Sequence, residues 1–291
     1  MGEVTPEYEA EWKKWHADRI SALTAPHGWI AMASQDWFTD GEPLQVEGIP
    51  GAFQLDGDVI TYLPGADDTI EIDGVPVTEP TVIPHGFKYS LVKALYQGKK
   101  VETIKRTDYD GSDIYGVRVR DPKEAERRSF DDLPTFPLDT RWVVPGRFSR
   151  SADEHLQVET IEKGVKEERH VIGTVTFALD GREYTLEVNG RPNDDTGVLE
   201  GSVHFTDQTS GNETYGNGRL VPIPDIEADA DTIVDFNKAH SFPCAFTNYV
   251  TCPLAPARNR LDVAIAAGEK KPATRIERIQ TFLKESEPAA V

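Results

Sequence analysis

The chain lacks any apolar run near the roughly 20 residues that a membrane-spanning helix needs. Its N-terminal segment is charged throughout and lacks the apolar core and cleavage site of a secretory signal. With two cysteines in 291 residues, it also has too few for a disulfide scaffold. These absences predict a cytoplasmic protein with no membrane partner.

Cationic side chains are scarce as well. The sequence holds 31 Lys and Arg against 50 Asp and Glu, which gives a net charge of −19. Nucleic acids and anionic membranes attract proteins mainly through such cations, so we expect no nucleic-acid partner. A local basic pocket for a small anion is still compatible with this charge. The 38% hydrophobic content is that of a globular chain long enough for an ample core.

The common signatures of cofactor and metal sites are also missing. The sequence contains no Walker loop, Gly-x-Ser-x-Gly elbow, dinucleotide fingerprint or His-Glu-x-x-His zinc motif. His85, His155 and His170 are scattered along the chain and lack ligand spacing. We therefore expect no cofactor and no metal site. The sequence carries no indication of an oligomeric state.

The N-terminal segment is patterned as a helix. Between Thr5 and Thr24, a stripe of mostly aromatic side chains recurs at spacings of three and four residues, the period of one helix face. The stripe consists of Tyr8, Trp12, Trp15, Arg19 and Leu23. We expect residues 1–25 to form a helix that packs this face on the body of the protein.

After Pro26 the period changes to two, and short β-branched or aromatic runs alternate with glycine turns. Asp-Gly begins at Asp56, Asp73, Asp110 and Asp180, and Asn-Gly begins at Asn189. Because these dipeptides adopt positive φ at low cost, they predict tight hairpins. The predicted strands are 52–55, 59–63, 87–95, 101–106, 114–119, 142–148, 156–161, 171–179, 183–188 and 198–205.

These strands predict a mainly β fold, an antiparallel barrel or two-sheet sandwich with helices at the two termini. The strand–helix alternation of a parallel sheet is missing. We expect the β-rich domain over residues 26–270, with two lobes joined near 121–140, where the chain is charged and then contains prolines. Residues 271–291 are expected to form a C-terminal helix and tail.

Two unusual strings occupy the C-terminal third. The first reads FTDQTSGNETYGNGR over 205–219. The second reads DFNKAHSFPCAF over 235–246, with TCPL at 251–254, NRL at 259–261 and AGEK at 267–270. Together they resemble a bacterial and archaeal family catalogued as domain of unknown function 1684, and the resemblance extends over about 12–270. The family implies a fold and a site region, but no settled reaction.

The chain departs from this family pattern beside the candidate site. It has His240-Ser241-Phe242 where Tyr-Asn-Pro is expected, and Leu220 where an aromatic residue often follows the arginine. The resemblance therefore leaves room for a different ligand.

The second string brings Asp235, Asn237, Cys244 and Cys252 within 18 residues, with Asn259 close behind. The cysteine spacing allows a disulfide, two metal ligands or two independent thiols. A structural zinc site normally has four protein ligands, and the sequence has no second cysteine pair. We therefore expect reduced thiols without metal. Cys244 is then either a buried, inert thiol or a nucleophile, and His240, four residues earlier, supplies a base for the second case.

The first string brings Asp207, Thr209, Tyr215 and Arg219 into a glycine-rich turn. Arg219 is suited to hold a ligand carboxylate or phosphate, with the Tyr215 hydroxyl as a further donor. Alternatively, Arg219 pairs with a carboxylate such as that of Asp235 and ties two strand ends together.

Two functions from different classes follow. The first is a binding protein that holds a small polar or anionic molecule at a loop cluster of Thr209, Tyr215, Arg219, Asn237, His240 and Asn259. The second is a hydrolase that uses Asp207, Asp235 or Glu269 as general base, or Cys244 as nucleophile. A third hypothesis is that the two strings only tie loops together. The sequence favours binding.

Overall fold

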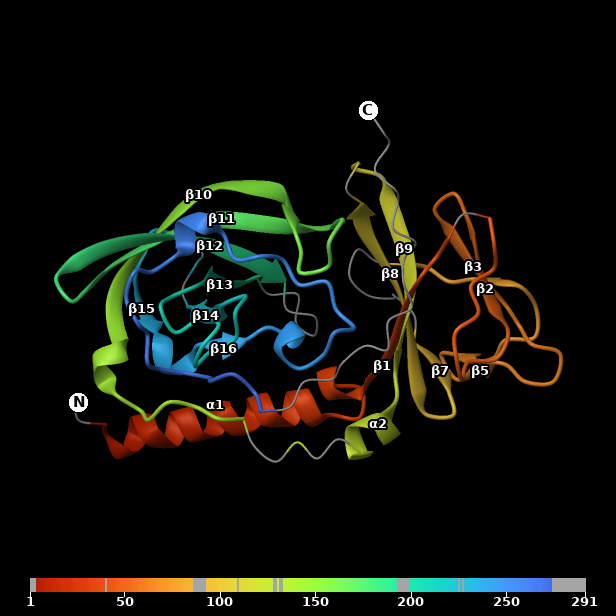
Figure 1. The fold of residues 1–291 in the computed structure, drawn as a ribbon, viewed down its shortest axis with the longest axis horizontal. Coiled ribbons are helices and arrows are strands. Elements are labelled where there is room, and N and C mark those ends of the chain that lie inside the picture. The colour runs from red at the N-terminus through yellow and green to blue at the C-terminus, as the bar shows by residue number, and fades with distance from the viewer. Residues whose placement is uncertain are drawn as a thin grey trace.

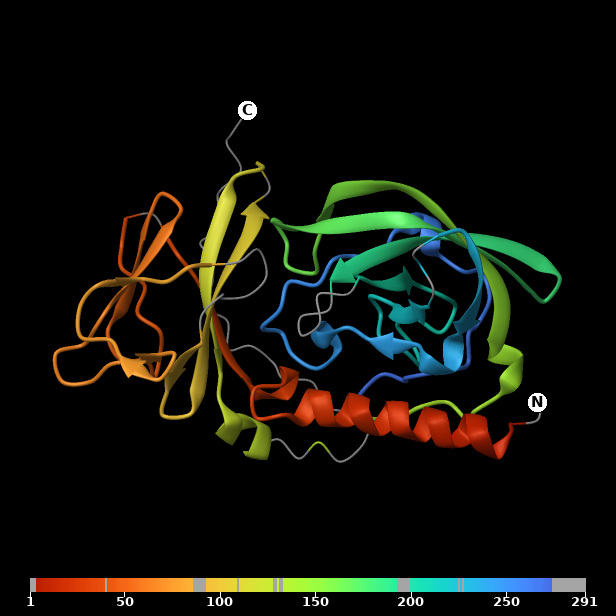
Figure 2. The ribbon, with the colours of Figure 1, turned by 180° about the vertical axis from the view of Figure 1, so that it is seen from behind.

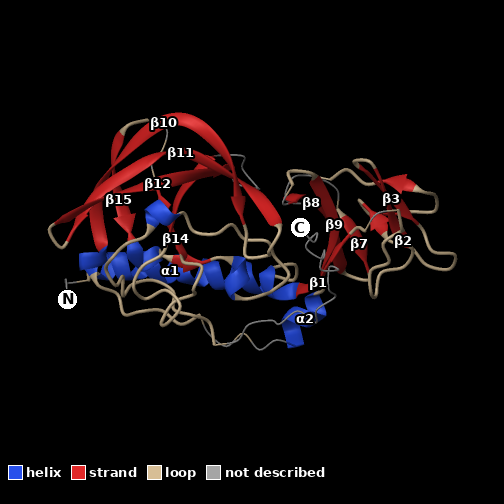
Figure 3. Ribbon diagram, turned by 45° about the horizontal axis from the view of Figure 1, so that its top comes forward, coloured by secondary structure: helices blue, strands red, loops and turns tan. Residues whose placement is uncertain are grey.

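The computed structural model describes residues 4–39, 41–85, 93–108, 110–127, 130, 133–192, 199–224, 226 and 228–273. Its architecture is mainly β, with one long helix, α1 (Pro6–Thr24), along one side (Figures 1 and 3). The predicted C-terminal helix lies outside the described residues, apart from its first positions. A second helix, α2 (Pro122–Arg127), is short.

Helix α1 begins where the sequence predicts. Thr5 caps its N-terminus by accepting a hydrogen bond from the backbone N–H of Tyr8, and Pro6 occupies the first turn, where no donor is lost. Of its side chains only Leu23 is fully buried. The helix runs along the C-terminal half of the molecule (Figures 1 and 2), and polar side chains make most of its anchoring contacts.

The N-terminal half contains two sheets around one apolar core, which includes Phe53, Ile60, Tyr62 and Val117. The smaller sheet has the order β2-β3-β6. Its strands and those of the neighbouring sheet are β1 (Met32–Trp37), β2 (Ala52–Asp56), β3 (Val59–Leu63), β4 (Glu71–Ile72), β5 (Val75–Pro76), β6 (Thr81–Val82), β7 (Ala94–Tyr96), β8 (Lys99–Asp108) and β9 (Asp113–Arg120).

The C-terminal half holds the strongly curved part of a 13-stranded sheet, with the strand order β15-β10-β11-β12-β13-β14-β16. A short pairing of β11 with β8 joins this part to the strands of the N-terminal half. Its strands are β10 (Val143–Glu159), β11 (Val165–Leu179), β12 (Arg182–Pro192), β13 (Leu199–Phe205), β14 (Arg219–Ile223), β15 (Ala230–Asp235) and β16 (His240–Ser241). The sheet encloses a core that includes Phe148, Phe177, Phe205 and Phe236. Short 3₁₀ turns follow or join the strands at Trp29–Ala31, Thr140–Trp142, Phe236–Lys238, Pro243–Ala245 and Ala257–Asn259.

All strand pairs in the described residues are antiparallel, so the predicted fold class is confirmed. The C-terminal sheet is not a closed barrel, because its ladder ends at β15 on one side and at β16 on the other. Across the opening, the Thr232 hydroxyl donates to the carbonyl of Pro224 at 3.1 Å. The residue 121–140 boundary between lobes stays a prediction.

The four Asp-Gly turns are confirmed, since each lies between two paired strands. Asp73 and Asp180 have φ of 50° and 49°, the left-handed conformation that these turns need. The prediction of a turn at Asn189-Gly190 is wrong, because both residues lie inside β12. A Cβ on Gly190 would lie 2.6 Å from Ile172 Cγ2, so this glycine allows close packing between strands.

Candidate functional site

Arg219 is the centre of a buried cluster built from the first string. It opens strand β14, and its side chain is 0% exposed. Its Nη2 lies 3.3 Å from Asp207 Oδ2 and donates to the carbonyl of Ile265 at 2.9 Å, and its Nη1 donates to the carbonyl of Ala267. Burial lowers the pKa of Arg219, while the charges of Asp207 and Glu269 oppose this effect. Of the two carboxylates that the sequence offers as partners, Asp207 and Asp235, the one that pairs with Arg219 is Asp207.

Asp207 is held from several sides. Its carboxylate accepts hydrogen bonds from the Thr209 hydroxyl at 2.8 Å and from the backbone N–H of Ile265 at 2.7 Å. Thr209 Oγ1 also lies 3.0 Å from Thr214 Oγ1. These contacts close the turn between β13 and β14 and tie it to the segment around Ile265. The same contacts leave the Asp207 carboxylate 0% exposed.

Asp235 and Asn237 form a second cluster, which lies against helix α1. The Tyr8 hydroxyl is 2.9 Å from Asp235 Oδ1 and accepts a hydrogen bond from Asn237 Nδ2 at 3.0 Å. Trp12 Nε1 donates to the Asn237 carbonyl at 2.8 Å. Burial raises the pKa of Asp235, and burial together with the Asp235 charge raises the pKa of Tyr8. The predicted helix stripe therefore contacts one of the predicted site strings.

Glu269 forms a third cluster, which also contacts helix α1. Its fully buried carboxylate accepts from Arg19 Nε at 2.9 Å and from the Ser241 backbone N–H at 2.7 Å. The preceding Gly268 has φ of 72°, and a Cβ there would lie 2.3 Å from the Ala239 carbonyl oxygen. Glycine is therefore required where Glu269 turns into the core.

Asn259 and Tyr215 also lie inside the protein. Asn259 is 0% exposed and bonds only backbone groups, accepting from Glu187 N–H at 2.8 Å and donating to the carbonyls of Glu187 and His204 at 3.0 and 2.9 Å. Tyr215 is partly buried and packs on the cluster of Cys244, Val250 and Cys252. In this arrangement Asn259 is a clamp between β12 and β13.

The two cysteines are buried and are not joined by a disulfide, as predicted. Burial, and next a hydrogen bond with Cys244, raises the pKa of the Cys252 thiol well above its ordinary value. Such a thiol is a weak nucleophile at neutral pH. His240 Nδ1 lies 3.1 Å from the Lys238 carbonyl oxygen, and its ring contacts that of Trp15. Burial lowers the pKa of His240 to about 4.

His204 gives these buried clusters a pH dependence. It is 1% exposed, its Nε2 lies 2.7 Å from the Asn217 carbonyl oxygen, and burial lowers its pKa to about 4. In the unfolded chain this histidine has a pKa of about 6.5 and is protonated below that pH, whereas in the folded protein it stays neutral down to about pH 4. Its contribution to the free energy of unfolding is therefore fully present above pH 6.5 and is lost as the pH drops toward 4.

We expect the free energy of unfolding to fall by on the order of 2 kcal/mol between pH 7 and pH 5 through this group. His204→Gln, whose amide can also donate to Asn217, should remove this share of the slope, while the similar share of His240 remains. Urea titrations at several pH values measure it. An equally steep slope in the variant would contradict the assignment.

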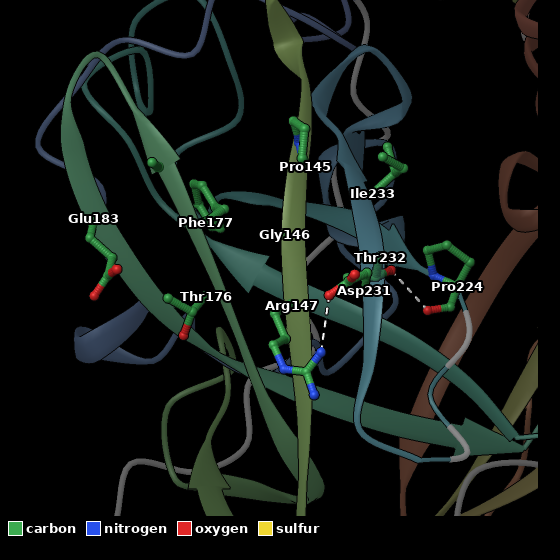
Figure 4. Close-up of a pocket in the computed structure, with 11 residues that line it drawn as sticks. Pro145, Gly146, Arg147, Thr176, Phe177, Glu183, Pro224, Asp231, Thr232 and Ile233 are labelled. Carbon is green, nitrogen blue, oxygen red and sulfur yellow. Dashed lines mark hydrogen bonds and ion pairs between the residues drawn. The ribbon is translucent and has the colours of Figure 1, made fainter.

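An open groove lies on the outer face of the curved sheet. It has a volume of about 570 Å³ and is bordered by β10, β11, β12 and β15. Figure 4 shows Arg147 and Asp231 on its wall, with Nη1 and Oδ1 3.0 Å apart. Their side chains are 57% and 91% exposed. Thr176, Glu183, Pro145 and Ile233 complete much of the lining.

None of these groove residues was selected from the sequence. Arg147 and Asp231 are opposite each other in the β10–β15 ladder, but they are far apart along the chain. The β15 strand itself was not predicted. A period-two pattern on 143–148 places Pro145 and Arg147 on the outer face, and this was the one available signal.

The fold and the three clusters define an antiparallel β protein. The two unusual sequence strings, 205–219 and the one that begins at 235, fold into its interior. Residues 128–270 match the family described as "Protein of unknown function (DUF1684)". The resemblance inferred from the two strings is confirmed, although the match begins at residue 128, C-terminal to Trp12.

A solved structure gives a partial likeness. The solution NMR structure of the uncharacterized protein from gene locus rrnAC0354 of Haloarcula marismortui is 29% identical, with 51% of this chain and 80% of that chain covered and a TM-score of 0.40. No curated protein matches the chain. Among the described residues, no helix is long and apolar enough to cross a membrane.

Proposed function

We propose that this chain is a small-molecule binding protein, and that its ligand occupies the outer groove rather than the loop strings. The observation that carries the proposal is the groove itself, because it combines an exposed guanidinium with apolar side chains such as Pro145 and Ile233 in a volume of about 570 Å³. Small-molecule sites are commonly concavities of roughly 300–1,000 Å³ with a few polar groups on an apolar lining.

The Arg147–Asp231 pair favours this reading. An ion pair so exposed contributes at most about 1 kcal/mol, so a ligand can displace Asp231 from Arg147 at little cost. A ligand carboxylate or phosphate then takes the planar donor fork of Arg147. Ile233, which is 43% exposed, offers apolar surface to the remainder of the ligand.

The surrounding charge narrows the ligand class. Glu183 and Asp231 lie on the same groove as Arg147, within a chain of net charge −19. A polyphosphate would be repelled by these carboxylates. The groove is therefore suited to a small monoanion or zwitterion with an apolar part.

The hydrolase alternative is less favoured. A general base must come within hydrogen-bond reach of the substrate proton that it removes. Asp207 and Glu269 have fully buried carboxylates, and the Asp235 carboxylate is occupied by Tyr8. Substrate access to these groups would require helix α1 or the 265–269 segment to move.

The test is the retention of small molecules by protein purified under native conditions. We expect mass spectrometry to find an anionic molecule released from the wild-type chain, and Arg147→Gln to lower its affinity roughly tenfold or more, because a hydrogen bond to a charged group contributes about 1.5–3 kcal/mol. Arg182→Gln is the control, since Arg182 also forms an exposed ion pair with an aspartate, Asp262, on the same half of the molecule. Equal retention by both variants would refute the proposed site.

A further inference from the structure

His155 and His170 lie side by side on the β10–β11 hairpin, although the sequence separates them. They are directly opposite each other in the antiparallel register. Their rings are stacked with centroids 4.4 Å apart and planes 15° apart. The side chains are 56% and 21% exposed, so an ion in solvent can reach the pair.

A carboxylate lies on one nitrogen of each ring. His155 Nδ1 is 2.7 Å from Glu168 Oε1, and His170 Nε2 is 3.1 Å from Asp153 Oδ2. Glu168 lies two positions before His170 on β11, and Asp153 lies in the irregular part of β10 between Arg150 and Glu154. The hydrogen bond with Glu168 places the proton of a neutral His155 on Nδ1 and leaves the lone pair on Nε2. His170 Nε2 lies near Asp153 without the geometry of a hydrogen bond, so this contact does not fix the tautomer of His170.

His155 has the arrangement that metal-binding histidines commonly have. Such a histidine donates its second ring nitrogen to a carboxylate, a carbonyl or water, and this contact fixes the tautomer and raises the basicity of the ligating nitrogen. Two imidazole nitrogens on one tetrahedral ion, each at about 2.0–2.1 Å, are roughly 3.4 Å apart. The two rings are stacked with nearly parallel planes, so one of them must turn out of the stack for both nitrogens to reach one ion.

We propose that His155 and His170 bind a divalent transition metal of the Zn²⁺, Ni²⁺ or Cu²⁺ class. Imidazole suits these ions, whereas Mg²⁺ and Ca²⁺ prefer oxygen ligands. No group of three or more His, Cys, Asp or Glu side chains in the described part of the chain is arranged to hold a metal. The site therefore has two protein ligands, and water or a ligand molecule completes the coordination. Asp153 and Glu168 orient the rings and offset the charge of the ion.

Arg150 is the main opposing charge. Its Nη2 lies 2.7 Å from Asp153 Oδ1, so Asp153 is shared between Arg150 and His170. The net charge of −19 favours cation binding over the surface as a whole. Arg150→Gln is accordingly expected to strengthen metal binding.

The test is a calorimetric titration of the metal-free, full-length chain with Zn²⁺ alone, followed by imidazole NMR spectra. We expect saturable binding of one ion with shifts confined to His155 and His170. His155→Ala and His170→Ala should each abolish it. Glu168→Gln, which keeps both ligands, should weaken it roughly tenfold. His27→Ala, an exposed histidine elsewhere, is the control and should bind like the wild type. Absence of saturable binding, or binding unchanged in the His155 and His170 variants, would overturn the proposal.

Discussion

Replacing Arg219 with methionine should lower the free energy of unfolding by about 3–5 kcal/mol, the usual cost of breaking a buried ion pair from one side. The substitution leaves the Asp207 carboxylate buried without its cation and removes a donor from the carbonyls of Ile265 and Ala267. Methionine fills a similar volume, so the loss reports the charge and hydrogen bonds rather than a large cavity. Urea denaturation measures it.

Arg182→Met provides the comparison. Arg182 also pairs with an aspartate, Asp262, but both side chains are more than half exposed. An exposed pair is worth at most about 1 kcal/mol, so this variant should remain close to the wild type. Equal losses in the two variants would mean that the Arg219 cluster does not support the fold as described.

Glu269→Ala is expected to cost about 3 kcal/mol or more and to loosen helix α1. The carboxylate accepts a hydrogen bond from Arg19 on the helix and another from the Ser241 backbone N–H. Hydrogen exchange over residues 6–24 should therefore accelerate in the variant. Glu11→Ala is the control, because Glu11 contacts Lys238 from a side chain that is 66% exposed.

A double-mutant cycle that combines Glu269→Ala with Arg19→Ala separates the loss of helix docking from a general loss of stability. If the Arg19–Glu269 pair holds the helix, the two substitutions together should cost less than the sum of the single losses, with a coupling of about 1–3 kcal/mol. Strictly additive losses, with unchanged exchange in the helix, would contradict this account of α1.

The hairpins were predictable because their signals are local. Asp-Gly at Asp56, Asp110 and Asp180 specifies the turn itself, and the flanking strands follow from it. The same rule failed at Asn189-Gly190, where contact with Ile172 on the adjacent strand determines the glycine. The local sequence around Gly190 does not indicate that Ile172 is its neighbour.

The length of β10 was missed for a related reason. Segments 142–148 and 156–161 were predicted as two strands, whereas one strand extends from Val143 to Glu159. The intervening residues are exposed and charged, so they show no apolar period, and pairing with β11 keeps them extended. Tertiary pairing overrides weak local preference in such strands.

The two polar strings were correctly selected as unusual, but the sequence could not tell which groups meet. Arg219 pairs with Asp207, twelve residues away in its own string, and Asp235 pairs with Tyr8 from the opposite end of the chain. The His155–His170 pair was missed because their separation of fifteen residues has meaning only once the β10–β11 register is known. Candidate residue types were visible, and their partners were not.

The central claim, that the ligand lies in the outer groove while the polar strings support the fold, is tested most directly by amide chemical-shift mapping. The molecule released from the native protein is titrated into the ligand-free chain. The account predicts chemical-shift changes concentrated at the amides of Arg147, Thr176, Asp231 and Ile233 and of the residues next to Pro145. Shifts concentrated instead at Tyr215, Arg219, Asn237 and Cys244 would contradict it and return the site to the loop strings.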